Sequence, residues 1–64
     1  MVIVNGQERD AAGKTVSQLL AAEGFDSGRI AVERNGDIVP KGLYGQTILR
    51  DGDTLEVVRF VGGG

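Results

Sequence analysis

The sequence ends in three consecutive glycines, Gly62, Gly63 and Gly64, which directly follow an apolar, β-branched segment. Three glycines in a row cannot hold a strand, because glycine loses the most backbone entropy on ordering and offers no side chain to pack. A tail without side chains can instead pass through a narrow channel and present its α-carboxylate to the active site of a partner. A frayed end or a linker remnant is the alternative, which the lack of a polar spacer before the glycines disfavours. The Gly64 carboxylate is therefore the candidate group for covalent chemistry.

The side chains themselves offer little catalytic chemistry. The 64 residues include no His, no Cys and no Trp, which excludes a Cys nucleophile, a His base, a zinc site and disulfides. A domain of this size buries only about 60% of the surface of its unfolded chain. Such a domain is too small to enclose a deep ligand cavity alone. We expect no catalytic residue, no bound metal and no bound cofactor.

Two short motifs are similar to ligand-binding loops but lack residues that such loops need. Gly13-Lys14-Thr15 matches the end of a phosphate-binding loop, yet Glu8 occupies the position of its first glycine. Asp51-Gly52-Asp53 lacks the further glycine and distal glutamate of a calcium loop. We interpret Thr15 as a helix cap and Asp51–Asp53 as a turn. Activation of the carboxylate by ATP must then come from a partner.

The charge pattern narrows the choice of partners. Seven Lys and Arg residues against nine Asp and Glu residues give a net charge of −2. No two basic residues are adjacent, so the basic stripe typical of nucleic-acid binding is missing. The longest apolar run has four residues, as at Met1–Val4, too few to span a membrane or to form a signal peptide. We expect a cytoplasmic protein that binds neither nucleic acid nor membrane.

One helix and several short strands must position the tail. Thr15 and Gln18 form a capping box, and Gly24 is suited to end the helix, so a helix is predicted over about 16–23. Its apolar stripe comprises Val16, Leu19 and Leu20. Asn-Gly pairs at 5–6 and 35–36 predict two hairpin turns. The predicted strands are Met1–Val4, Gln7–Asp10, Ile30–Glu33, Asp37–Val39, Thr47–Leu49 and Thr54–Val61.

The last strand separates its side chains between two faces. Leu55 and Val57 alternate with Val58 and Phe60 along it, so the first pair is predicted beneath the helix and the second on the face that one helix leaves uncovered. Ordinary scattered surface residues are the alternative. We predict that a partner docks on the apolar residues beside the tail, which are Val58, Phe60 and Val61.

The segments 32–36, 51–58 and 60–64 together resemble the ThiS family of sulfur carriers in thiamine biosynthesis. They read Val-Glu-Arg-Asn-Gly, Asp-Gly-Asp-Thr-Leu-Glu-Val-Val and Phe-Val-Gly-Gly-Gly. The resemblance implies an α+β, ubiquitin-like β-grasp fold, in which a mixed sheet of four to five strands packs on one helix. It also implies that the first and last strands are adjacent and parallel at the sheet centre. The expected organisation is a β-grasp domain over 1–61 and a flexible tail over 62–64.

The resemblance further implies a carrier rather than an enzyme. A ThiF-type adenylyltransferase would use ATP to adenylate the Gly64 carboxylate, with Gly62 and Gly63 threaded through its active site. Sulfur from a cysteine desulfurase would convert the adenylate to a thiocarboxylate. A ThiG-type thiazole synthase would then receive the sulfur.

Three alternatives remain open from the residues alone. A small subunit of molybdopterin synthase would use the same tail chemistry, although it is typically longer. A ubiquitin-like protein modifier would also use it. A non-covalent β-grasp interaction module would carry an inert tail, and exposure to ATP and an adenylating enzyme would separate it from the others.

Overall fold

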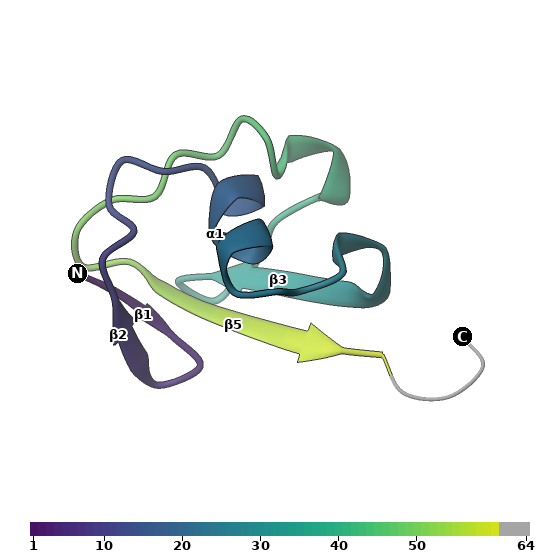
Figure 1. Ribbon diagram of the computed structural model, residues 1–64, viewed down its shortest axis with the longest axis horizontal. Coiled ribbons are helices and arrows are strands. Elements are labelled where there is room, and N and C mark those ends of the chain that lie inside the picture. Colours follow the sequence, from purple (N-terminus) through teal and green to yellow (C-terminus); the bar gives the residue numbers. More distant parts are fainter. Residues whose placement is uncertain (61–64) are drawn as a thin grey trace.

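The computed structural model describes residues 1–60, and Val61 and Gly62–Gly64 lie outside the described residues. A five-stranded sheet packs against one helix, with the long connections on the same side as the helix (Figure 1). The elements are β1 (Val2–Val4), β2 (Gln7–Arg9), α1 (Val16–Ala22), β3 (Ile30–Arg34), β4 (Asp37–Ile38) and β5 (Thr54–Arg59), with 3-10 turns η1 (Ser27–Arg29) and η2 (Lys41–Leu43). Within residues 1–60, no helix is long and apolar enough to cross a bilayer.

The strand order is β2-β1-β5-β3-β4. The first and last strands, β1 and β5, are parallel neighbours, and the other three pairings are antiparallel. This arrangement confirms the expected mixed sheet with the two terminal strands at its centre. The predicted boundary between a domain and a tail stays a prediction, because it lies outside the described residues.

Both Asn-Gly turns form as predicted. Asn5 and Gly6 have φ of 50° and 81°, and Asn35 and Gly36 have φ of 52° and 88°. Positive φ at both central residues matches the twist of the flanking strands and is tolerated best by asparagine and glycine. The turns therefore set the registers of β1 with β2 and of β3 with β4.

The predicted helix caps are also confirmed. The Gln18 amide donates to Thr15 Oγ1 at 3.1 Å, and the Thr15 amide donates to Gln18 Oε1 at 2.8 Å. At the other end, Gly24 has φ of 78° and the Phe25 amide donates to the Leu20 carbonyl at 2.9 Å. This pattern is a Schellman motif, which satisfies carbonyls that the helix leaves free. The caps hold α1 to seven residues.

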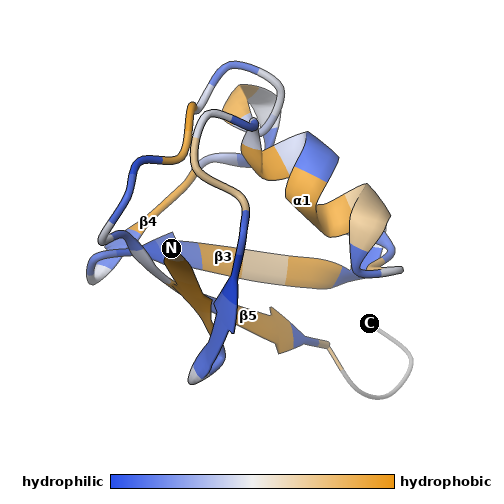
Figure 2. Cartoon of the chain, turned by 60° about the vertical axis from the view of Figure 1, so that its left-hand side comes forward, coloured by the Kyte–Doolittle hydropathy of each residue, from blue (hydrophilic) through white to orange (hydrophobic). Residues whose placement is uncertain are grey.

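One apolar core lies between α1 and the sheet. The apolar face of the helix points toward the strands (Figure 2). The largest side chains of the core are less than 2% exposed and include Leu20, Ile30, Leu49, Leu55, Val2, Val16 and Val32. Every strand except β2 and β4 contributes to this set, so the central strands and the helix share one hydrophobic layer.

The prediction of a strand at Thr47–Leu49 is wrong. Only one isolated bridge occurs there, between Ile48 and Thr15. The Leu49 amide donates to the Lys14 carbonyl at 2.8 Å, so this extended segment pairs with the residues before α1 and not with the sheet. Leu49 is nevertheless buried. The strand-like composition of this segment therefore reflects burial beside α1 and not membership of the sheet.

Other boundaries shift by a residue or two. β3 extends to Arg34, and β1, β2 and β4 are each shorter by one residue than predicted. β5 ends at Arg59, so Phe60 lies just beyond it. The turn η1, where the Gly28 amide donates to Asp26 Oδ1 at 3.0 Å, is an addition to the predicted connection.

Candidate functional site

The strand that leads to the glycine tail is held on both sides at its start. β1 pairs with β5 only at Thr54 and Leu55, whereas β3 pairs with β5 from Leu55 through Arg59. The Phe60 amide then donates to the Arg29 carbonyl at 2.9 Å. β3 and the last residue of η1 therefore support the chain up to residue 60, after β1 has ended (Figure 1).

Asn5 continues the support on the β1 side as far as Val57. Its Oδ1 accepts from the Val57 amide at 2.8 Å, and its Nδ2 donates to the Val57 carbonyl at 3.2 Å. A side-chain amide thus takes the place of the next residue of β1. The sequence pattern indicates Asn5 only as a turn residue, and this second role was not predicted.

The second Asn-Gly turn also contacts β5. Asn35 Oδ1 accepts from the Thr54 amide at 2.9 Å, while Asn35 Nδ2 donates to Asp53 Oδ1 at 3.0 Å. Two turns that are far apart in sequence therefore both fasten β5. The available signal was the choice of asparagine at the first position of both turns, since asparagine tolerates positive φ and also carries an amide.

Asp53 lies immediately before β5 and is a buried carboxylate, only 6% exposed. Its carboxylate accepts from Arg34 Nε at 2.9 Å, from the Arg50 amide at 2.9 Å and from Asn35. Burial by itself raises the pKa of this carboxyl. Hydrogen bonds from Arg50, Arg34 and Asn35, with the positive charge of Arg34, outweigh burial and hold the pKa of Asp53 below its ordinary value of 3.8. Asp53 thus joins the β3–β4 turn to β5 as an ionised group.

We expect Asp53→Asn to lower the free energy of unfolding by about 1–3 kcal/mol near neutral pH, because it removes a charged acceptor from buried donors. A folded-state pKa below the unfolded value means that Asp53 stabilises the fold above about pH 3.8. That contribution is lost as the pH falls through the folded pKa. Urea unfolding at several pH values should therefore show wild type and variant converging in acid. The exposed Asp10→Asn is the matched control, and a gap that persists undiminished in acid would contradict the ionic role.

The predicted exposure of Val58 and Phe60 is confirmed, and Val58 lies on the face that α1 leaves uncovered. Val58 is 53% exposed and Phe60 is 57% exposed, whereas Leu55 and Val57 are buried. The pairing registers place Val58 opposite Ala31 and Glu56 opposite Glu33. We use the name helix-free face for the side of the sheet that carries Ile3, Glu8, Ala31, Glu33, Ile38, Thr54, Glu56 and Val58.

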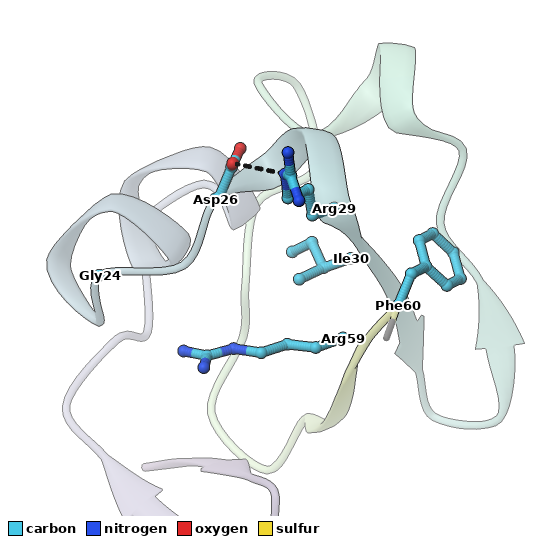
Figure 3. A pocket seen from close by; sticks show the side chains of 6 residues that line it. All are labelled: Gly24, Asp26, Arg29, Ile30, Arg59 and Phe60. Atoms are coloured by element: carbon cyan, nitrogen blue, oxygen red, sulfur yellow. Dashed lines mark ion pairs between the residues drawn. The ribbon is translucent and has the colours of Figure 1, made fainter. Parts of the chain in front are cut away.

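The other side of the β5 end is charged. Arg59 lies over the Phe25 ring, with its guanidinium carbon 5.3 Å from the ring centroid, a cation–π contact. Figure 3 shows Arg59 and Phe60 pointing to opposite sides of the chain. Arg59 lines a pocket of about 300 Å³ together with Gly24, Asp26, Arg29, Ile30 and Phe60. Within it, Arg29 Nε lies 3.7 Å from Asp26 Oδ2.

The two motifs that are similar to ligand loops have structural roles. Thr15 caps α1, and the Gly13 amide donates to the Leu49 carbonyl at 2.8 Å and not toward an open loop. Gly52, with φ of 91°, forms the predicted turn before β5. Of the predicted site residues, Val58 and Phe60 lie together beside the end of β5. Val61, Gly62, Gly63 and Gly64 lie outside the described residues.

A mixed sheet with its terminal strands parallel at the centre and a single helix on one face defines a ubiquitin-like β-grasp domain. The crystal structure of the thiamine biosynthesis protein ThiS from Geobacter metallireducens superposes with a TM-score of 0.81 and 33% identity, over 98% of this chain and 97% of that chain. A profile of the ThiS family matches residues 2–64. The chain belongs to the ThiS family.

Two curated relatives are similar to this chain over most of its length. The sulfur carrier protein ThiS of Bacillus subtilis is 42% identical over 50 residues, covering 78% of this chain and 76% of that protein. The thiazole synthase of Paramagnetospirillum magneticum is 52% identical over 64 residues, covering 98% of this chain. The chain spans about a fifth of the length of the two thiazole synthases that it matches.

Proposed function

We propose that this protein carries sulfur on the Gly64 carboxylate and delivers it to a thiazole synthase. A partner enzyme of the ThiF type would adenylate the carboxylate, and a cysteine desulfurase would supply the sulfur. The protein would act as a co-substrate, without a metal or cofactor of its own. The use of ATP by the partner enzyme would locate the proposed reaction in the cytoplasm.

The family match carries this proposal, since it covers residues 2–64 and therefore includes the three glycines. The geometry of β5 gives support. The strand lies at the sheet centre, is fastened by Asn5, Asn35 and Asp53, and leads directly toward residues 61–64. A strand fastened by these hydrogen bonds, followed by a tail without side chains, is suited to presenting a terminal group. A similarity to proteins named thiazole synthase supports the choice of acceptor.

The chemistry requires activation before sulfur can enter. A free α-carboxyl has a pKa of about 3.3–3.7, so it is an anion and a poor electrophile at neutral pH. Attack of a carboxylate oxygen on the α-phosphorus of ATP would release pyrophosphate and give an acyl-adenylate. The terminal persulfide sulfur of the desulfurase would then attack the carbonyl carbon and expel AMP, and a reductant would cleave the resulting S–S bond to release the thiocarboxylate. The protein contributes the carboxylate and the surface by which the partner holds it.

The test is to incubate the protein with ATP, its cognate adenylating enzyme, a sulfur-loaded cysteine desulfurase and a phosphine reductant. The mass of the C-terminal peptide should rise by the difference between sulfur and oxygen. Because the sequence contains no Cys, a thiol-directed alkylating reagent should then label that peptide. Met1 is the only methionine, and its oxidation adds a nearly equal mass, so the increment must be located by fragmentation. A C-terminal peptide of unchanged mass that takes no label would contradict the proposal.

We propose that the adenylating enzyme docks on Val58, Phe60 and Val61. Phe60→Ala should raise the apparent KM for the carrier about tenfold with little change in kcat, because an exposed aromatic side chain is a typical anchor of an interface. Its free energy of unfolding should change by less than about 0.5 kcal/mol, as for other surface changes. Ile48→Ala is the control, since Ile48 is 48% exposed but lies on the helix side of the sheet. A large loss of stability with a normal KM would show instead that Phe60 belongs to the core.

A further inference from the structure

The helix-free face holds two carboxylates directly opposite each other. The β3–β5 register pairs Glu33 with Glu56, and side chains opposite each other on neighbouring antiparallel strands have Cβ atoms about 4.5–5.5 Å apart. Like charges in this arrangement destabilise a sheet. The folded protein therefore keeps a repulsive pair at the centre of its exposed face.

No cation of the described residues neutralises this pair. The ion pairs within residues 1–60 use the carboxylates of Asp26, Asp51, Asp53 and Glu23, and neither Glu33 nor Glu56 takes part. Arg34, the neighbour of Glu33 in sequence, points to the other face and donates to Asp53. The residues that the strand registers place on the helix-free face include three glutamates and no Lys or Arg.

Apolar side chains flank the two glutamates along both strands. Ile38 lies opposite Glu33 and is 74% exposed, while Val58 follows on β5 opposite Ala31. In Figure 2 the helix covers one side of β3 and β5, and the opposite side of these strands carries no other element of the described chain. The pattern is an acidic centre within an apolar surface, and it continues toward Phe60.

We infer that this face binds the surface of the adenylating enzyme that presents an Arg or Lys between apolar side chains, with the cation placed against Glu33 and Glu56. This inference rests on the proposed function. A cation on the partner would pair with both carboxylates and remove their repulsion. Because the free protein keeps this repulsion, its relief would contribute favourably to the free energy of binding. A site that binds the phosphates of ATP is itself rich in positive charge, which favours this partner. A second copy of the chain is disfavoured, because it would bring another pair of glutamates against the first.

The test compares a double variant, which carries both Glu33→Gln and Glu56→Gln, with a control variant. The control is Asp37→Asn, which removes a carboxylate of the same sheet that lies on the opposite face. In the free protein, the double variant should raise Tm by about 1–5 °C. In pyrophosphate exchange with the cognate adenylating enzyme, its apparent KM should rise about tenfold or more while kcat changes little. Asp37→Asn should leave KM unchanged. The KM of the wild type should also rise with salt, which weakens attraction between charges.

A raised Tm together with a raised KM supports the inference, because the loss of a structural role would instead lower Tm. A double variant with unchanged KM, or one with a lowered Tm, overturns it while leaving the proposed function in place. An unchanged KM together with weaker binding to thiazole synthase also overturns it, by assigning the face to the other partner. A wild-type protein that supports no exchange contradicts the proposed function instead.

Discussion

Deleting Gly63 and Gly64 is expected to abolish sulfur loading while leaving the fold unchanged. The deletion places the terminal carboxylate two residues short, a distance of up to about 7 Å in an extended chain. A misplacement of about 1 Å can already reduce a reaction about 100-fold, so adenylation should fall by at least that factor. Pyrophosphate exchange and alkylation of the C-terminal peptide would both measure the loss.

The same deletion should change the free energy of unfolding by less than about 0.5 kcal/mol, since glycines have no side chains to bury. The docking residues Val58 and Phe60 remain, so the shortened protein should compete with the wild type for the adenylating enzyme. If the shortened protein competes for the enzyme but is not adenylated, docking and the chemistry of the tail depend on different residues. A deletion that melts the protein would contradict a presented tail, and one that still loads sulfur would contradict the role of Gly64.

Leu20→Ala should give the largest loss of stability, about 2–5 kcal/mol. Leu20 is 1% exposed and lies in the core between α1 and the sheet. Truncation removes apolar contacts and leaves a cavity that a core this small can fill only in part. In a domain of about 60–100 residues, each kcal/mol corresponds to about 4–8 °C in Tm, so thermal unfolding should show a fall of at least about 8 °C.

Leu43→Ala is the matched control, because Leu43 lies in η2 and is 44% exposed. Its effect should stay below about 1 kcal/mol. Equal losses for the two variants would show that the core does not lie where the helix pattern places it. For the Leu20→Ala molecules that remain folded, adenylation should be normal, since the tail and the helix-free face are unchanged.

Local patterns in the sequence determined the elements whose physical causes are local. The Asn-Gly turns, the Thr15–Gln18 capping box and the Gly24 helix end depend on φ preferences and on hydrogen bonds between residues close in the chain. The alternation along β5 likewise predicted which side chains are buried, because strand geometry assigns neighbours to opposite faces. The motifs at 32–36, 51–58 and 60–64 indicate the ThiS family by their residue types and spacing alone, and the family match over residues 2–64 confirms it.

Tertiary structure decided the features that depend on pairing between distant segments. The apolar residues 47–49 satisfy a strand pattern, but they bond to the residues before α1, and no local preference could identify that partner. Asp53 reads as an ordinary turn residue, and only the approach of Arg34 and Asn35 makes its burial as an anion favourable. Glu33 and Glu56 are separated by more than 20 residues in sequence and face each other only because of the β3–β5 register. A register is a property of two strands together, since the side-chain pattern of either one fits several alignments until the core selects one.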